Sequence, residues 1–382
     1  MHNQQILHNA RLVLADSVVS GSLVMDEGKI TEIDSQNYSG PQGIDCEQDY
    51  LIPGLIEMHT DNLEKYFVPR PGIYWPSVSA ALIAHDNQIF NAGITTVLDA
   101  VALGFTDETN FRSKILDASV NTIKYAQENK MVRADHYLHF RCELPSETVF
   151  ESFASHANSP LLRLVSVMDH TPGQRQWSNL QKWRLYHSGK KWTDADAQAE
   201  IDKRARLQES HGDQNRRDIL ALCQELELPA ASHDDTLPEH CVVARESGIT
   251  ISEFPTTLTA ARKARELGMT IIMGAPNMVR GESHSGNISS HELAENDLLD
   301  GFSSDYMPIS LLHSAFVLHQ KFSVPLPKAL STITSNIAEM VHLDDRGRLE
   351  VGKKADIVRV RVEDGLPVVK AIWKNGAMML NS

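Results

Sequence analysis

The sequence has few cysteines and no long apolar run. Its four cysteines, Cys46, Cys142, Cys223 and Cys241, form no CxxC pair, which excludes a disulfide framework and a four-cysteine zinc site and favours a reducing compartment. No stretch approaches the ~18 to 20 consecutive apolar residues of a membrane helix, and the polar residues 1–5 show no secretory signal. We therefore expect a cytoplasmic protein that has no membrane partner.

A surplus of positive charge is also missing. The 382 residues include 36 Lys and Arg against 50 Asp and Glu, a formal net charge of −14. An acidic surface repels a phosphate backbone, so we expect no nucleic-acid partner. A small phosphorylated ligand stays compatible with this charge, because a metal ion or a local group of basic side chains can reverse the sign inside one pocket.

Both ends of the chain have the pattern of short β-strands. Apolar and polar residues alternate through residues 5–33, with a hairpin turn predicted at Asp26-Glu27-Gly28, and again through residues 355–373. Each end alone is too small to form a stable sheet. We predict that residues 1–52 and 345–382 together form a small β-sandwich domain and that residues 53–344 form a second domain inserted between them.

The central segment alternates short apolar runs with stretches of helical spacing. Eight runs are candidate strands: residues 55–58, 95–99, 137–141, 163–168, 230–232, 250–253, 270–273 and 301–304. Eight strand–helix units in about 290 residues are typical of the α/β fold of a (β/α)8 TIM-type barrel. Residues 173–217, rich in tryptophan and charge, interrupt this rhythm and are predicted to be a partly helical insertion.

Residues that bind metals end several predicted strands. They are His59 and Asp61 after the first strand, Glu143 after the third, His170 after the fourth, His233 after the fifth and Asp305 after the eighth. The C-terminal strand ends form the active-site face of a barrel, and imidazole and carboxylate groups bind zinc, iron or manganese. One such residue alone is more often a hydrogen-bonding or capping group. Five strand ends together favour a metal site.

Three segments resemble motifs of the amidohydrolase superfamily. They are PGLIEMHTD at residues 53–61, GITTV at 93–97 and VGKKADIV at 351–358. The resemblance implies a metal-bearing barrel with a small β domain made from both chain ends. The superfamily usually has His-x-His after the first strand, whereas this chain has Asp61 in the second position.

Longer segments resemble one family in particular, the α-D-ribose 1-methylphosphonate 5-triphosphate diphosphatases of the carbon–phosphorus lyase pathway. Among them are HTDNLEK (59–65), HFRCEL (139–144), MDHTPGQRQ (168–176), ASHDD (231–235), EFPTT (253–257), MGAPN (273–277) and SSDY (303–306). The resemblance spans nearly the whole chain. It implies hydrolysis of that ribosyl phosphonate to the 5-phosphate and pyrophosphate, with one or two divalent metal ions, zinc first and manganese or iron as alternatives.

The resemblance also implies roles for single residues. Asp305 matches the strand-eight aspartate that removes a proton from the attacking water, and Glu143 would bridge the ions if two are bound. The substrate is highly anionic, so a local group of cations is required. The candidates for substrate binding are Lys65, Arg70, Arg175, Asn277, Arg280 and His284.

Two other classes of function stay open at this point. A C–N hydrolase, such as a cyclic amidase or a deacetylase, would use the same metal site. Some barrels of this superfamily instead serve as non-enzymatic assembly proteins after losing their metal ligands, which this chain retains. A homo-oligomer is compatible with each of these functions.

Overall fold

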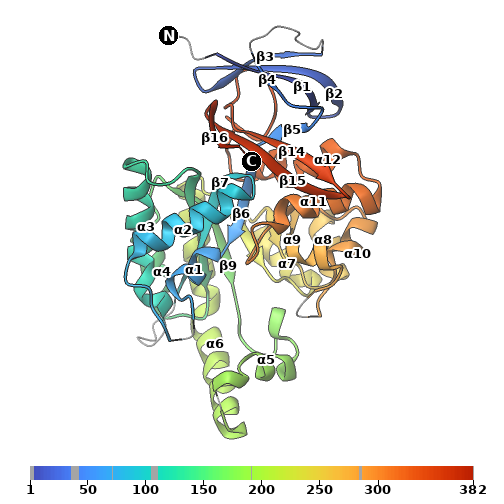
Figure 1. Ribbon diagram of the computed structural model, residues 1–382. Helices are drawn as coiled ribbons and strands as arrows, with labels where there is room; N and C mark the ends of the chain where they lie inside the picture. Colours follow the sequence, from blue (N-terminus) through green and yellow to red (C-terminus); the bar gives the residue numbers. More distant parts are fainter. Residues whose placement is uncertain are drawn as a thin grey trace. The chain divides into compact units, whose positions relative to one another are not determined.

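The computed structural model describes residues 4–35, 43–70, 72–104, 111–190, 192–283 and 286–381 (Figure 1). The chain divides into two compact units. The first contains Met1–Asp99, Ile123–His136 and Gly301–Ser382, and the second contains Ala100–Thr122 and Tyr137–Asp300. Within the described ranges, no helix combines the length and the hydropathy needed to cross a bilayer.

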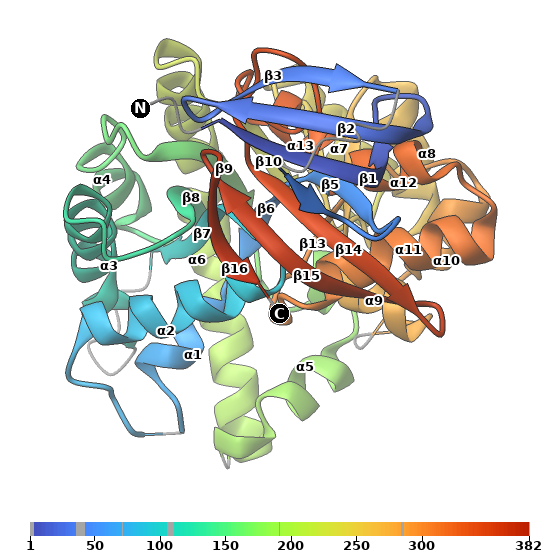
Figure 2. The same cartoon turned by 45° about the horizontal axis from the view of Figure 1, so that its top comes forward.

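One mixed sheet of the first unit joins the two ends of the chain (Figure 2). Its strands are β1 (Gln5–Val13), β2 (Val18–Asp26), β3 (Lys29–Asp34), β4 (Ile44–Asp45), β5 (Tyr50–Pro53), β14 (Ile357–Glu363), β15 (Leu366–Lys374) and β16 (Ala377–Asn381). The order is β16-β15-β14-β5-β1-β2-β3, with β4 paired to β1. Strand β5 joins the two halves, because Leu51 pairs with Leu12 on one side and with Arg359 on the other.

The predicted hairpin turn lies between β2 and β3, where Asp26 pairs with Lys29. The two residues inside the turn, Glu27 and Gly28, have φ angles of 48° and 79°. Positive φ at both positions is the requirement of a tight type I′ turn, whose twist matches that of the flanking strands.

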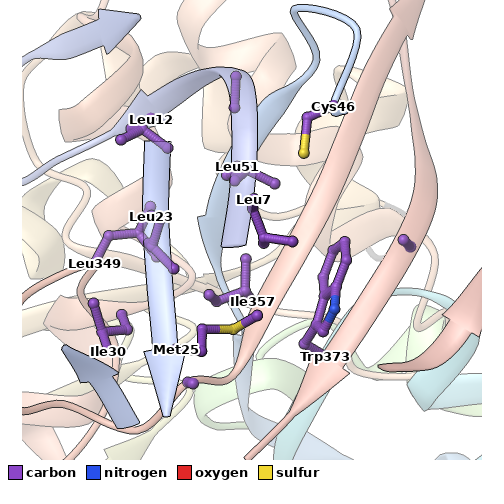
Figure 3. Packing of buried hydrophobic residues seen from close by; sticks show 13 residues of the cluster. Leu7, Leu12, Leu23, Met25, Ile30, Cys46, Leu51, Leu349, Ile357 and Trp373 are labelled. Carbon is purple, nitrogen blue, oxygen red and sulfur yellow. The ribbon is translucent and has the colours of Figure 1, made fainter. Parts of the chain in front are cut away.

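Apolar side chains from both chain ends share one core beneath this sheet (Figure 3). The labelled members are Leu7, Leu12, Leu23, Met25, Ile30, Cys46, Leu51, Leu349, Ile357 and Trp373. Leu23 and Met25 alternate along β2 with the period of two that places side chains on one face of a strand. Trp373 is fully buried and its Nε1 donates to Gln5 Oε1 at 3.2 Å. Neither end could bury this core alone.

The second sheet is parallel, and its eight strands follow one another in chain order. They are β6 (Leu55–Thr60), β7 (Ile94–Leu103), β8 (Asp135–Glu143), β9 (Leu162–Met168), β10 (Ala230–His233), β11 (Ile251–Glu253), β12 (Thr270–Gly274) and β13 (Gly301–Ser303). Each contains or overlaps one predicted strand. Thr60 and Asp305 form a parallel bridge at the two ends of this order, so the sheet nearly closes into a barrel. The predicted fold class is confirmed.

Helices follow most of the barrel strands. They are α1 (Asn62–Phe67), α2 (Val78–Asn91), α3 (Phe111–Glu128), α4 (Val149–Ala154), α5 (Leu180–Tyr186), α6 (Asp194–Glu225), α7 (Pro238–Glu246), α8 (Leu258–Glu266), α9 (Ala275–Arg280), α10 (Ser290–Glu295), α11 (Ser310–Phe322), α12 (Leu326–Ser331) and α13 (Ser335–Met340). The short 3-10 helices η1 (Arg175–Trp177) and η2 (Ser188–Lys190) flank α5.

The segment predicted as an insertion is helical over much of its length. Helix α6 begins at a capping box, in which Asp196 N donates to Thr193 Oγ1 at 3.1 Å and Thr193 N donates to Asp196 Oδ2 at 2.9 Å. Trp183 of α5 is fully buried and packs against Ala197 and Ile201 of α6. The predicted limits of this insertion and of the two domains stay predictions.

Three fully buried polar side chains form a hydrogen-bonded network in the first unit. His85 Nε2 and His136 Nδ1 each donate to a different oxygen of Asp99, both at 2.7 Å, and His136 Nε2 lies 3.4 Å from Asp86 Oδ1. Burial alone would lower the pKa of His136 and raise that of Asp99. The ion pairs outweigh burial, so the pKa of His136 rises to about 9 and that of Asp99 falls to about 2.

This network predicts a pH dependence of stability. The pKa of His136 rises from 6.5 unfolded to about 9 folded, so its stabilisation is complete below pH 6.5 and is lost as the pH rises through 9. We expect the free energy of unfolding, measured by urea denaturation, to fall over this range. His136→Gln should be less stable and should flatten the fall, whereas His156→Gln, at a partly exposed position, should retain it. An unchanged slope in His136→Gln would contradict this assignment.

Candidate metal centre

Asp305 lies beside the end of β6 in the first unit. Its N–H donates to His59 O at 3.1 Å, and its carbonyl accepts from Asp61 N at 3.2 Å and from Thr60 Oγ1 at 2.6 Å. Asp305 has a φ of 53°, in the left-handed region that aspartate tolerates better than most residues. These contacts bring the backbone of the predicted general base next to that of the first predicted ligand pair.

Glu57 ties the ends of β6 and β13 together from inside the sheet. Its carboxylate accepts from His59 N at 2.8 Å and from Ser304 N at 2.7 Å. The side chain is fully buried, and burial raises its pKa to about 8. Glu57 is not among the predicted site residues. Its only sequence signal is a carboxylate inside an otherwise apolar strand, at the spacing of two from His59.

In the second unit, two imidazoles and a carboxylate converge after β9 and β10. His170 Nε2 and His233 Nε2 lie 3.9 Å and 3.4 Å from Asp234 Oδ2. Asp234 is buried, and its Oδ2 has no hydrogen-bond partner among the residues that the structure describes. A buried carboxylate oxygen without a donor is unfavourable, so these atoms surround a place where a cation would be stabilised.

The other ring nitrogen of each imidazole, Nδ1, forms a hydrogen bond with a carboxylate. Glu143 accepts from His170 Nδ1 at 2.6 Å and from His170 N at 2.9 Å, and Glu253 accepts from His233 Nδ1 at 2.7 Å. A neutral imidazole that donates from Nδ1 keeps its lone pair on Nε2. Both lone pairs are therefore directed toward Asp234, in the carboxylate–histidine arrangement typical of metal ligands.

The same contacts shift the pKa values of Glu143 and His233. Burial raises the pKa of Glu143, but its electrostatic interaction and hydrogen bonds with His170 outweigh burial and leave the pKa below its ordinary value. Burial lowers the pKa of His233, but Asp234 and Glu253 raise it overall. Negative charge therefore surrounds both imidazoles and favours a cation between them.

The donor set fits a divalent transition metal. Two ligands at about 2.0–2.1 Å from a tetrahedral zinc ion lie about 3.4 Å apart. His233 Nε2 and Asp234 Oδ2 are 3.4 Å apart. His170, His233 and Asp234 also form one of the His/Cys/Asp/Glu groups that could hold an ion. Imidazole and carboxylate groups bind zinc, iron and manganese alike, so the donors do not select among these metals.

A second buried chain of hydrogen bonds leads from β8 to the same centre. His139 Nε2 lies 2.6 Å from Ser166 Oγ, and Ser166 Oγ donates to Glu253 Oε2 at 2.8 Å. Both His139 and Glu253 are fully buried. They lie within the sequence motifs but are not among the predicted ligands. The available signal was the alternation of polar residues along β8, where His139 and Glu143 are four residues apart on one face.

The predicted substrate-binding cations occupy different surroundings. Arg175 Nη1 donates to Asp235 Oδ1 at 2.7 Å and to His233 O at 2.9 Å, which places Arg175 beside the metal donors. Arg216 of α6, which was not predicted, has its pKa lowered by burial and by the like charge of Arg175. Arg175 is therefore a cation beside His233, and Arg216 is close enough to Arg175 for their like charges to interact.

The other predicted substrate residues that the structure describes make contacts of their own or are exposed. Arg280 is exposed and pairs with Glu282 at 3.3 Å, and Lys65 is exposed and donates to Tyr306 O. Arg70 is exposed. The Asn277 side chain forms hydrogen bonds within the protein: its Nδ2 donates to Ile288 O at 3.2 Å, and its Oδ1 accepts from Ser290 N at 3.0 Å. His284 lies outside the described residues.

A family model described as the amidohydrolase family matches residues 164–366 of the chain. A close relative described below covers almost the whole sequence. The chain belongs to the amidohydrolase family. This superfamily is metal-dependent, and the described residues include groups that could hold a metal ion.

Within this family, the chain is similar to a particular enzyme of Escherichia coli (strain K12), the alpha-D-ribose 1-methylphosphonate 5-triphosphate diphosphatase. The two are 43 % identical over 374 residues, which cover 97 % of this chain and 99 % of the relative. The chain is also 22 % identical over 405 residues to the imidazolonepropionase of Thermoplasma volcanium, covering 96 % of this chain and 92 % of that relative.

Solved structures of the superfamily share the fold. A 5-methylcytosine deaminase from Klebsiella pneumoniae, liganded with 5-fluorocytosine, has a TM-score of 0.66 at 14 % identity and covers 99 % of this chain and 98 % of its own. A dihydropyrimidinase from Brevibacillus agri has a TM-score of 0.64 at 13 % identity, with 99 % and 95 % covered. At these identities the likeness concerns the fold alone.

The geometry predicts which substitutions remove the metal. His233→Ala and Asp234→Ala should each strongly reduce the metal content of the purified protein, measured by inductively coupled plasma mass spectrometry. Glu253→Gln should weaken metal affinity by roughly 10- to 100-fold, the usual effect of removing a carboxylate behind a ligating histidine. His211→Ala, on the exposed side of α6, is the control and should keep its metal. Full metal content in both His233→Ala and Asp234→Ala would contradict this site.

Proposed function

We propose that this protein hydrolyses α-D-ribose 1-methylphosphonate 5-triphosphate to the 5-phosphate and pyrophosphate during phosphonate catabolism in the cytoplasm. The observation that carries the proposal is the 43 % identity, over 97 % of the chain, to the E. coli enzyme of that activity. The buried imidazole and carboxylate donors support it, because they fit the metal that phosphoanhydride hydrolysis uses. The proposal includes neither a nucleic acid nor a membrane as partner.

The proposed centre holds one or two ions, with zinc first and manganese or iron as alternatives. Its ligands are drawn from His59, Asp61, Glu143, His170 and His233, with Asp234 added by the structure. Support comes from sheet order, since the strands that carry these residues belong to one parallel sheet whose carboxyl ends share an edge. A bound divalent metal would lower the pKa of a water toward 7 and offset charge on the phosphoryl oxygens.

In this proposal Asp305 acts as the general base. Its backbone is fixed by hydrogen bonds to His59, Thr60 and Asp61, so Asp305 lies next to the first pair of proposed ligands. Asp305 accepts a proton from water while the water oxygen bonds to the α-phosphorus. The bond between the α-phosphorus and its bridging oxygen breaks, and that oxygen leaves with the pyrophosphate. Arg175, held by Asp235 beside His233, would stabilise the anionic product.

A C–N hydrolase is the second candidate, favoured by the imidazolonepropionase match. The same metal donors serve both reactions, so the substrate decides between them. Arg175, which donates to His233 O, favours a phosphorylated substrate. Parallel assays with the ribosyl triphosphate and with cyclic amides distinguish the two functions.

The role of Asp305 predicts a selective loss of turnover. Asp305→Asn should keep the metal and the fold but reduce kcat by roughly 10²-fold or more, the usual scale for removing a general base. The control is Asp297→Asn, an exposed aspartate with the same φ of 53°, which should retain wild-type kcat. Loss of metal together with activity would make Asp305 chiefly a ligand, and an unchanged kcat would exclude both roles.

The position of bond cleavage tests substrate and mechanism together. Hydrolysis in ¹⁸O-labelled water, followed by phosphorus NMR of both products, should place the label in the sugar monophosphate, because water attacks the α-phosphorus. Label in pyrophosphate would place the attack at the β-phosphorus. Release of orthophosphate instead of pyrophosphate would contradict the proposed activity.

A further inference from the structure

Arg141 is a cation on the metal-binding face of β8. Side chains alternate along a strand, so Arg141 shares its face with His139 and Glu143, two residues away on either side. Glu143 holds His170, and His139 leads through Ser166 to Glu253. The guanidinium of Arg141 therefore enters the region occupied by the metal donors of the second unit.

Strand pairing places Arg141 next to the same hydrogen-bond chain. Arg141 of β8 pairs with Ser166 of β9. Ser166 Oγ donates to Glu253 Oε2 at 2.8 Å, and the same carboxylate oxygen accepts from His233 Nδ1 at 2.7 Å. Arg141 and His233 thus belong to one neighbourhood.

Two nitrogens of this guanidinium lack a protein partner. Nε and Nη1 of Arg141 are buried and have no hydrogen-bond partner in the part of the chain that the structure describes. Other basic side chains of the same unit differ: Arg175 bonds to Asp235 and Arg204 to Glu200, both at 2.7 Å, and Arg163 on β9 has one buried unpartnered nitrogen, Nε, rather than two. Guanidinium stays charged at every accessible pH, and a buried charge without an acceptor is unfavourable. The unsatisfied donors point to an anion that the protein does not itself supply.

We propose that Arg141 binds phosphoryl oxygens of the substrate polyphosphate and is a determinant of specificity for it. A chain of phosphates offers several oxygens to donors that point in different directions, and charge-assisted hydrogen bonds to them are strong. Naming the ribosyl triphosphate rests on the proposed function, whereas polyphosphate binding by Arg141 does not. Arg141 was not among the residues predicted to bind substrate.

Binding of inorganic tripolyphosphate tests the contact without catalysis. Titration calorimetry of the purified, metal-containing protein compares the wild type with Arg141→Met, which keeps an apolar stem, and with Arg141→Lys, which keeps the charge. Loss of two charge-assisted hydrogen bonds should weaken binding by roughly tenfold or more in Arg141→Met and by less in Arg141→Lys. The control is Arg163→Met on the adjacent strand β9, where the guanidinium lies 5.1 Å from the ring centre of Tyr137; its affinity should be that of the wild type.

Kinetics separate binding from a merely structural role. With the ribosyl triphosphate, Arg141→Met should raise KM while the metal content and the thermal melting temperature stay those of the wild type. If Arg141→Met does not fold, Arg141→Lys carries the test through the same ratio of affinities. Wild-type affinity for tripolyphosphate in a folded Arg141 variant, or no binding by the wild type, would overturn the inference. Arg141-dependent tripolyphosphate binding without hydrolysis of the ribosyl triphosphate would uphold the inference and reject the proposed function.

Discussion

Hydrogen bonds between carboxylates and imidazoles decide which atoms face the metal-binding region. Glu143 and Glu253 each hold the Nδ1 of one histidine, so the Nε2 atoms of His170 and His233 face Asp234 Oδ2, at 3.9 and 3.4 Å. The contacts with His170 also favour the charged form of Glu143 inside the protein, because they lower its pKa below the ordinary value. Without them the imidazoles could rotate, and the three donor atoms would lose their common direction.

The net charge of the molecule repels an anionic substrate, whereas cations near the candidate site attract it. A net charge of −14 repels an anionic substrate at long range. Arg175, which donates to His233 O, and Arg141, on the same face of β8 as Glu143, oppose this repulsion locally within one compact unit. The two cations differ in what they already bind: Arg175 is paired with Asp235, whereas Arg141 has two buried donors without a partner among the described residues.

The sequence was sufficient to predict the strands, because short buried runs bounded by polar residues are a local signal. It also showed ligand-type residues at the strand ends, and the active site of a barrel lies at the C-terminal ends of its strands. It could not distinguish a ligand from the residue that holds a ligand. Whether Glu143 coordinates an ion or binds His170 depends on a 2.6 Å contact between residues 27 positions apart. Glu57 and Glu253 lie inside strands, where no motif separates a functional carboxylate from an isolated one.

The substrate-binding residues were harder to predict for a related reason. A basic residue within a motif shows charge but not whether an acidic neighbour already neutralises it. Asp235 neutralises Arg175 from 60 positions away, which no local pattern shows, and Glu282 neutralises Arg280 from two positions along the chain. Arg141 was overlooked because its importance lies in a missing partner, which only the three-dimensional arrangement reveals.

The sheet that joins the two chain ends has a consequence for biosynthesis. Strand β5 pairs with β1 on one side and with β14 on the other, through residues such as Leu51 and Arg359. The ribosome makes β14, β15 and β16 after all the strands of the barrel, so until then β5 has an unpaired edge and Leu7, Leu23 and Leu51 lack the cover of Trp373. A nascent chain that stops before residue 357 therefore leaves this edge of β5 open to pairing with another strand.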